Sequence, residues 1–352
     1  MDRSNSMSDS KTNLPDADET SERGDIVLQV EDLRMYLHTR WGVTKAVDGV
    51  TFDLRAGETL GIVGESGSGK SMLALSLVRL TPEPASRFEG GKVLLNGVDL
   101  VALSDRKMRK IRGKQISMIL QDPQQSLNPV FTVGNQLEEA IRIHGAARTK
   151  GEAHERAIDA LREVHVPEPE RRLKNYPHEM SGGMKQRVVG AMAMVYTPTV
   201  LIADEPTTAL DVTIQAQYLR LLRDLQRRTG VAMIVISHDF GVIAETCDRV
   251  AVMYAGRFVE HGTVAEVFDN PSHPYTKGLL DSHPRYVGRD ERLRSIDGAP
   301  PELTDLPPGC RFSPRCELAG PECSESEPGP RQVFDEHVTW CFKSEELPWA
   351  NH

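Results

Sequence analysis

Short apolar runs punctuated by glycine predict several β-strands in the first third of the chain. A β-rich entry is expected over Asp25–Leu37, and the run "TLGIV" at residues 59–63 predicts a further strand. Gly91–Leu100 holds two short apolar runs around Asn-Gly, a pair typical of a tight hairpin. The run "QISMILQ" (Gln115–Gln121) is predicted to be a buried strand.

Later in the chain, helical spacing alternates with apolar runs. From about Gly134 to Arg172 the spacing is helical, without a strand signal. The segments "TVLIADEP" and "VAMIVISHD" are apolar runs that end in acids, as buried parallel strands do. Ile214–Gly230 is predicted to be an amphipathic helix that stops at glycine. Strands and helices in this order predict an α/β fold.

The composition changes near both ends of the chain. Residues 1–24 are polar, rich in Ser and Asp, and lack the apolar core of a signal peptide, so we expect a disordered tail. Past about Ser282, Pro and Gly rise and the periodicity fades. We therefore expect one large domain over residues 25–282 and a small extension over 283–352. The longest apolar run, Val231–Ile236, is much shorter than the ~18–20 residues that span a bilayer, so we expect a cytosolic chain.

"GESGSGKS" (Gly64–Ser71) fits the phosphate-binding loop G-x-x-x-x-G-K-[ST]. It lies between a predicted strand and a predicted helix, which is the context that the motif needs. Its glycines let backbone N–H groups turn toward phosphate oxygens, Lys70 can reach the β- and γ-phosphates, and Ser71 can bind Mg²⁺. The residues expected to contact the nucleotide are Gly64, Glu65, Ser66, Gly67, Ser68, Gly69, Lys70, Ser71 and Met72.

Two adjacent carboxylates end the strand in "VLIADEP". Asp204 is placed to support Mg²⁺ at the carboxyl edge of the sheet. Glu205 follows directly, where a carboxylate can orient the attacking water. An Asp-Glu pair after a strand is often an ordinary loop start, but beside a phosphate-binding loop it predicts a nucleotide-hydrolysing site.

"MSGGMKQR" (Met180–Arg187) resembles the signature of ABC ATPases, and other marks of that family follow the family's order. Gln121 matches the Q-loop position, "ALD" (Ala209–Asp211) matches the D-loop, and His238 matches the switch histidine. The resemblance implies a RecA-like core, an antiparallel β-subdomain and a helical subdomain at about residues 122–190. It also implies ATP and Mg²⁺ as ligands. Gln121 and Asp204 would reach the metal beside Ser71, and Lys70, Glu205, Gln121 and His238 would serve catalysis.

The family works as a head-to-tail dimer. The resemblance implies that Ser181, Gly182 and Gly183 contact ATP held by a second ATPase subunit. ABC ATPases also stack adenine on an aromatic near the N-terminus. The preferred register places Leu37 there, and its neighbour Tyr36 is the candidate, with Trp41 nearby.

Finer marks resemble the ATPase subunits of oligopeptide, dipeptide and nickel importers. They are "QDPQQSLNP", "NPSHPYTKGLL" and "GAPPELTDLPPGCRFSPRC". This resemblance implies a subunit at the cytoplasmic face of the membrane that couples ATP hydrolysis to solute uptake. Its partners would be a second, often non-identical ATPase, two permeases and an extracytoplasmic substrate-binding protein.

Two other functions are weighed against import. A soluble ABC ATPase acting on nucleic acid or ribosomes is disfavoured because the chain shows one cassette and a formal net charge of −9. A small-molecule kinase would share only the phosphate-binding loop, leaving the S-G-G turn and His238 unexplained.

Four of the five cysteines fall within the last 43 residues, at Cys310, Cys316, Cys323 and Cys341. Zinc usually prefers tight C-x₂₋₄-C pairs, and these gaps are wider, which favours a [4Fe–4S] cluster. Some related importer ATPases resemble this pattern and carry such a cluster. Zinc and unligated thiols stay open as alternatives, and His337 is a reserve ligand. Cys247 is expected to be a buried apolar residue.

Overall fold

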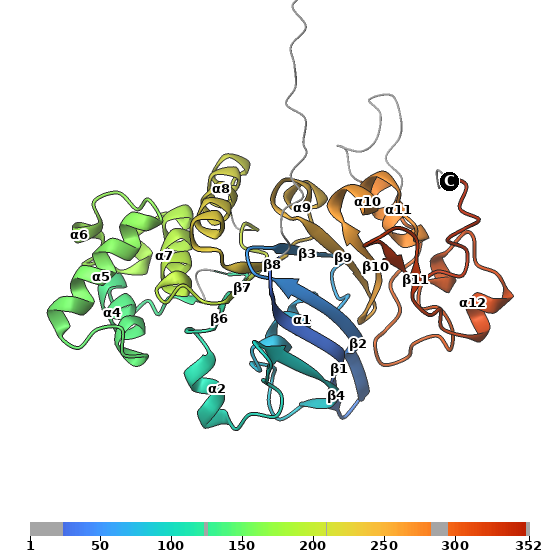
Figure 1. Ribbon diagram of the computed structural model, residues 1–352, viewed down its shortest axis with the longest axis horizontal. Coiled ribbons are helices and arrows are strands. Elements are labelled where there is room, and N and C mark those ends of the chain that lie inside the picture. The colour runs from blue at the N-terminus through green and yellow to red at the C-terminus, as the bar shows by residue number, and fades with distance from the viewer. Residues whose placement is uncertain (1–23, 123–125, 209, 283–294, 350–352) are drawn as a thin grey trace, which may run out of the picture.

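The computed structural model describes residues 24–349 except for 123–125, 209 and 283–294. The expected N-terminal tail, residues 1–24, therefore lies almost wholly outside the described residues. The described chain contains a four-stranded sheet and an eight-stranded sheet, with helices around the larger one (Figure 1).

The smaller sheet is antiparallel, in the order β2-β1-β4-β5. Its strands are β1 (Ile26–Thr39), β2 (Gly42–Arg55), β4 (Ser86–Leu95) and β5 (Val98–Asp99). The predicted hairpin forms: Leu95 pairs with Val98, and the intervening Asn96 and Gly97 both have positive φ, at 48° and 79°. Two positive φ values are what a tight hairpin turn requires, and Asn-Gly is the pair that tolerates them.

The larger sheet has the order β11-β12-β10-β9-β3-β8-β7-β6. Its strands are β3 (Thr59–Val63), β6 (Ile116–Ile119), β7 (Val200–Asp204), β8 (Ala232–Ile236), β9 (Arg249–Tyr254), β10 (Arg257–Thr263), β11 (Arg331–Gln332) and β12 (Val338–Thr339). The strands from β6 to β9 are parallel, and every residue of β3, β7 and β8 is buried. Because parallel strands share one carboxyl edge, the loops after β3, β7 and β8 lie close together.

Some helices lie around this sheet, and others lie at the edges of the molecule (Figure 1). They are α1 (Lys70–Leu77), α2 (Asp105–Ile111), α4 (Val133–Ile143), α5 (Lys150–Glu163), α6 (Pro169–Arg172), α7 (Gly182–Met194), α8 (Val212–Thr229), α9 (Phe240–Thr246), α10 (Val264–Asp269), α11 (Pro274–Asp281) and α12 (Pro321–Glu325), with 3-10 turns at Pro177–Glu179 and Ser313–Arg315. Helices α4 to α7 gather at one end of the molecule, and the C-terminal segment lies at the other (Figure 1).

Helix α8 shows how local sequence sets an element's limits. Asp211 caps its first turn by accepting a hydrogen bond from the Ile214 amide at 3.1 Å. Gly230, with φ of 69°, ends it in the left-handed conformation. The predicted amphipathic helix and its glycine stop are thus confirmed.

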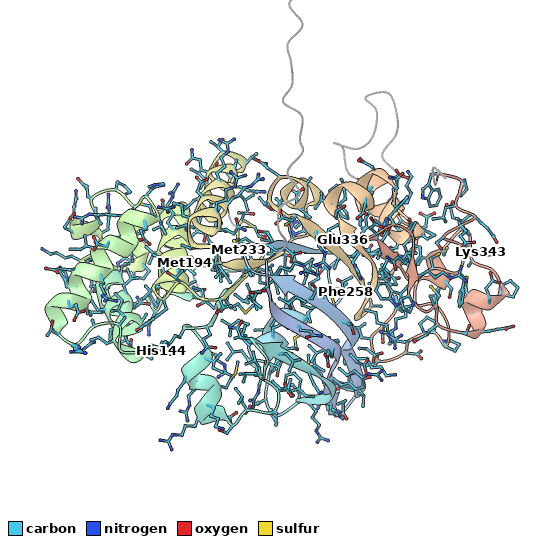
Figure 2. All side chains as sticks on the ribbon, viewed as in Figure 1. His144, Met194, Met233, Phe258, Glu336 and Lys343 are labelled. Carbon is cyan, nitrogen blue, oxygen red and sulfur yellow. The ribbon has the colours of Figure 1, made fainter. Side chains whose placement is uncertain are left out.

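Packed side chains join the two sheets. Phe258 of β10, labelled in Figure 2, lies near the middle of the molecule. Its ring packs against that of Phe52 of β2, with centroids 5.8 Å apart. Both rings belong to one apolar cluster that also contains Leu28, Ile62 and Leu73. The phosphate-binding loop is therefore fixed between two sheets that share a core.

The C-terminal segment joins the larger sheet directly. β12 pairs with β10 through Glu260–Thr339 and His261–Val338. His337 is fully buried, and its Nε2 lies 2.6 Å from Oε1 of Glu260. This pairing removes His337 as a reserve ligand for the cysteines, because its ring faces the buried carboxylate of β10.

Candidate nucleotide-binding site

The phosphate-binding loop begins where β3 ends, and its glycines are sterically required. A Cβ on Gly64 would lie 2.1 Å from the Met253 carbonyl oxygen, and one on Gly69 would lie 2.2 Å from that of Ala46. Both glycines also have positive φ, at 154° and 107°. Only glycine allows the loop to pass this close to neighbouring backbone.

Lys70 starts helix α1 and folds back over the loop. Its Nζ donates to the carbonyl oxygens of Gly64 at 2.7 Å and Glu65 at 2.8 Å. Burial lowers the pKa of Lys70, while the charges of Glu205, Asp204 and Glu65 act in the opposite direction. A buried ammonium surrounded by oxygens is suited to bind phosphate.

Ser71 and Asp204 meet at the carboxyl edge of the sheet. The Ser71 hydroxyl donates to Oδ1 of Asp204 at 3.2 Å. Asp204 ends β7 and is 4% exposed, and burial raises its pKa, with Glu205 adding to the rise. A hydroxyl and a buried carboxylate are hard oxygen ligands of the kind that Mg²⁺ prefers, so this pair fits the expected metal.

Glu205 is the point where three segments converge. Its Oε2 accepts hydrogen bonds from Nε2 of Gln121 at 2.8 Å and from the Thr208 hydroxyl at 2.9 Å. Its Oε1 lies 3.3 Å from Nδ1 of His238. Its φ is 45°, an uncommon value for a residue other than glycine, and its amide donates to the Ile236 carbonyl oxygen at 2.9 Å. The structure thus brings together Gln121, Glu205 and His238, which the sequence placed far apart.

Thr208 is the contact that sequence reasoning missed. Two threonines directly follow "DEP" in the sequence, but a hydroxyl three residues after an acid is an ordinary loop feature. The direction in which this hydroxyl points is set by the fold of the loop, which no sequence pattern shows.

The S-G-G turn begins helix α7. Ser181 is the N-cap and accepts from the Met184 amide at 3.3 Å. A Cβ on Gly183 would lie 2.7 Å from a methyl carbon of Ile214 on α8, so glycine allows these helices to pack. Ser181 and Gly182 are exposed, and no hydrogen bond joins them to the phosphate-binding loop within the described part of the chain. Ala209 of the expected D-loop lies outside the described residues.

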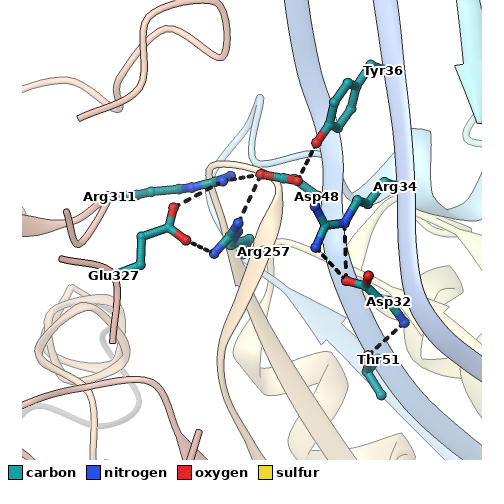
Figure 3. A network of polar contacts seen from close by, with 8 residues as sticks. All are labelled: Asp32, Arg34, Tyr36, Asp48, Thr51, Arg257, Arg311 and Glu327. Carbon is teal, nitrogen blue, oxygen red and sulfur yellow. Dashed lines mark hydrogen bonds and ion pairs between the residues drawn. The ribbon is translucent and has the colours of Figure 1, made fainter. Parts of the chain in front are cut away.

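Tyr36 is held at its hydroxyl. The hydroxyl donates to Oδ1 of Asp48 at 2.6 Å, and burial raises the pKa of Tyr36 to about 12 (Figure 3). Leu37 packs against the apolar cluster between the sheets, and Trp41 is 77% exposed beneath the Arg40 guanidinium. The adenine-stacking role of Tyr36 stays a prediction.

The four C-terminal cysteines line one enclosed cavity, together with Phe312 and His273. Burial raises the pKa of Cys310 and Cys316, and raises that of Cys341 to about 12. Among the described residues, however, no group of three or more His, Cys, Asp or Glu side chains is arranged to hold a metal ion. The thiols thus share a cavity without forming a ready ligand set, and neither the expected cluster nor zinc is supported by their arrangement.

Cys247 lies apart from these four. A Cβ on Gly61 would lie 3.1 Å from its sulfur, and burial raises the pKa of Cys247 to about 12. Cys247 is only half-buried, but it packs against the apolar core as expected.

Known proteins resemble the chain along almost its whole length. The model of the ABC transporter family matches residues 47–208, and the model of the oligopeptide/dipeptide transporter C-terminal region matches residues 259–323. A probable peptide ABC transporter ATP-binding protein of Sinorhizobium fredii is 50% identical over 330 residues, covering 94% of this chain and 98% of the relative. This chain belongs to the peptide-importer family of ABC transporter ATP-binding proteins.

Other relatives agree with that assignment. The dipeptide transport ATP-binding protein of Bacillus subtilis is 49% identical over 320 residues, covering 91% of this chain and 95% of the relative. The oligopeptide transport ATP-binding protein of the same organism is 50% identical over 312 residues, covering 88% and 87%. This ABC protein is accordingly an ATPase, as predicted.

Solved structures support the same fold. A dimeric ATP-binding cassette in a post-hydrolysis state with ADP and phosphate has a TM-score of 0.60 at 26% identity, covering 67% of this chain and 98% of that cassette. A cassette from Clostridium perfringens, part of an ABC transporter complex, has a TM-score of 0.57 at 28% identity, covering 69% and 91%. The predicted P-loop ABC ATPase fold is confirmed.

Proposed function

We propose that this ABC protein is the ATP-hydrolysing subunit of an importer for oligopeptides, dipeptides or similar small solutes. The observation that carries the proposal is the convergence of Gln121 and His238 on Glu205, at the sheet edge that also holds the phosphate-binding loop. Relatives named for peptide and dipeptide transport, matched over nearly the whole chain, support the substrate class.

Each site residue has one task in this proposal. Lys70 and the loop amides bind the β- and γ-phosphates. Ser71, Asp204 and Gln121 would hold Mg²⁺, which would supply positive charge to neutralise the phosphates. Glu205 orients the attacking water, and His238 contacts the γ-phosphate. Phosphoryl transfer needs mainly positioning and charge stabilisation, which these fixed groups supply.

A second ATPase subunit, a non-identical homologue, completes the site. The exposed Ser181 and Gly182 turn, with Gly183 behind it, binds ATP held by that subunit. A cassette solved as a dimer supports this arrangement. The resulting closure and opening of the pair would transmit the energy of hydrolysis.

The remaining partners are two membrane permeases and an extracytoplasmic substrate-binding protein. Within the described residues, no helix is both long and apolar enough to cross a bilayer. We assign the chain to the cytoplasmic face of the membrane, bound to the permeases, because its relatives are named as ATP-binding proteins of peptide transport systems. Val130 and Phe131, which are 74% and 50% exposed and follow Gln121 in sequence, are suited to contact a permease helix.

We also propose that Cys310, Cys316, Cys323 and Cys341 hold a [4Fe–4S] cluster, with zinc as the alternative. The proposal rests on the sequence spacing of the four cysteines, and the one structural fact consistent with it is that all four line a common cavity. Because burial opposes free thiolates there, bound iron would be what stabilises the charged form. The cluster would have a structural or redox-sensing role, and no step of ATP hydrolysis passes through it.

The test of the transport proposal is reconstitution with the permeases in proteoliposomes. Uptake of a labelled dipeptide should require ATP and should be lost in Lys70→Ala. ATPase activity stimulated by RNA or ribosomes, and unaffected by the permeases, would favour the rival function.

A further inference from the structure

Two arginines of the C-terminal segment reach into the ATP-binding part of the molecule. Arg311 and Arg315 are the first and last of the five residues between Cys310 and Cys316. A 3-10 turn spans Ser313–Arg315. Their side chains are 6% and 4% exposed. Arginines so deeply buried need partners, and each forms its shortest ion pair with a carboxylate outside the C-terminal segment.

Arg311 anchors the turn to the two sheets. Its guanidinium donates to the Ala255 carbonyl oxygen at 2.5 Å and pairs with Oδ2 of Asp48 (Figure 3). Burial would raise the pKa of Asp48, but hydrogen bonds from Tyr36 and Arg311 and the charges of Arg311 and Arg257 lower it to about 2. The carboxylate is therefore ionised at every physiological pH, and the anchor is permanently charged.

Arg315 extends from the same turn to the phosphate-binding loop. Its two terminal nitrogens donate to the two oxygens of Glu65, at 2.7 and 3.0 Å. The guanidinium lies 5.9 Å from the ring centroids of Tyr254 and Phe312, and its Nε donates to the Asp297 carbonyl oxygen at 3.0 Å. A fork of this kind fixes both the position and the orientation of a carboxylate.

Glu65 is held at its backbone as well. Its amide donates to the Tyr275 hydroxyl at 2.8 Å, and its carbonyl oxygen accepts from Nζ of Lys70 at 2.8 Å. Glu65 therefore connects Arg315 to the lysine expected to bind phosphate. The loop around it contains three glycines with positive φ, so its backbone has wide freedom unless side chains restrain it.

We infer that Arg315 is a positioning residue for ATP: through Glu65 it holds the phosphate-binding loop in the geometry that accepts phosphate. The C-terminal segment is thereby part of the nucleotide site of its own subunit. The apparent Kd equals the intrinsic Kd divided by the fraction of the protein whose loop is in the binding-competent geometry. A smaller fraction therefore means weaker binding. Arg315 thus acts on ATP affinity, while the chemistry at Glu205 is left unchanged. This inference rests on the proposed ATP site.

The experiment compares variants of the full-length chain by binding of a fluorescent ATP analogue, and by kcat and KM for ATP in the complex with the permeases. Arg315→Gln should raise Kd and KM about tenfold, with kcat at saturating ATP changed less than about twofold. Glu65→Gln should raise Kd by a similar factor, and the Kd of the double variant should be no higher than that of either single variant. The matched control is Arg331→Gln, which should bind normally. Arg331 is exposed, and its side chain donates to the Phe342 carbonyl oxygen without an ion pair among the described residues.

Several outcomes would overturn the inference. One is an unchanged Kd in a folded Arg315→Gln. Another is an equal rise of Kd in Arg331→Gln. A third is that the effects of the Glu65 and Arg315 substitutions add in full. If Arg315→Gln does not fold, Arg315→Lys decides instead, because one ammonium keeps the charge but not the fork; Kd should rise, and an unchanged value overturns the inference. Normal binding by Lys70→Ala would reject the ATP site itself, whereas loss of binding there with normal binding in Arg315→Gln rejects the inference alone.

Discussion

Nε2 of Gln121 lies 2.8 Å from Oε2 of Glu205, which joins the strand edge at β6 to the acid that follows β7. The same carboxylate accepts from Thr208 and lies 3.3 Å from Nδ1 of His238. Its position is thus fixed from three directions by groups of the protein itself. Electrostatic and positional preorganisation of this kind is what a hydrolytic site requires.

Glu205→Gln should keep ATP binding and slow turnover by about 100-fold or more, the size typical of losing one preorganised catalytic group. The amide is isosteric and still bonds Thr208, but it cannot hold water as a carboxylate does. Single-turnover hydrolysis and binding of a fluorescent ATP analogue measure the two effects. Glu155→Gln, at an exposed position of α5, is the control and should behave as wild type. Full turnover by Glu205→Gln would refute its role.

The signature turn should act on the ATP of the neighbouring subunit. Ser181 is exposed and bonds only within its own helix, in the part of the chain that the structure describes. Ser181→Arg should leave ATP binding to the isolated chain intact while sharply lowering hydrolysis by the assembled pair, because the bulky cation blocks the interface.

Mixing variants makes this prediction decisive. A subunit with Lys70→Ala and a partner with a mutated signature should damage the same composite site and leave the other site working. Two damaged sites in that mixture would contradict the head-to-tail arrangement. The measurement compares the rate of ATP hydrolysis by the mixed pair with the rates of pairs that carry only one of the two variants.

The sequence predicted which residues carry the chemistry of the site. It did not predict which residues from distant segments contact them. Local patterns located β3, β7, β8 and the phosphate-binding loop, because buried strands and glycine turns leave a strong signal. The positions of Gln121, Glu205 and His238 followed from the order of family motifs. The Arg315–Glu65 pair joins residues 250 positions apart, and no local pattern encodes such a contact.

The cysteine-lined cavity shows the same limit. Spacing alone favoured a cluster and kept His337 in reserve, but the structure buries His337 against Glu260. It also gathers four thiols around a cavity without forming a ready ligand set. Pairing between β12 and β10 decides the position of His337, and strand pairing between such short segments is not readable from their sequence.

Metal analysis tests the cysteine proposal. Anaerobically purified protein should be brown, absorb broadly near about 400 nm and contain about four iron atoms, the content of one [4Fe–4S] cluster. Replacing all four cysteines with serine should remove both colour and iron, while Cys247→Ser should remove neither. Colourless protein with one equivalent of zinc would select the alternative. If the wild-type protein contains no metal and the four-serine variant folds equally well, the site is rejected.

Stability should fall as the pH drops below neutrality because of His261. Its pKa is lowered to about 4, chiefly by burial and also by the charges of Arg249 and His337, against the opposing charge of Asp53. Its ring lies against Trp340, with centroids 5.6 Å apart, and its Nδ1 has no hydrogen-bond partner among the described residues. Folding therefore favours the neutral ring.

The unfolded chain takes up a proton on this histidine near pH 6.5, whereas the folded chain does so only near pH 4. The stabilisation from His261 is thus complete above about pH 6.5 and is lost as the pH falls toward 4. Between pH 7 and 5 the loss is about 2 kcal/mol. Urea unfolding should be measured at both pH values. The free energy of unfolding should fall by about 2 kcal/mol less in His261→Gln than in wild type. Arg331→Gln is the control and should show the wild-type fall. An equal drop in His261→Gln and wild type would mean that other groups govern the acid sensitivity.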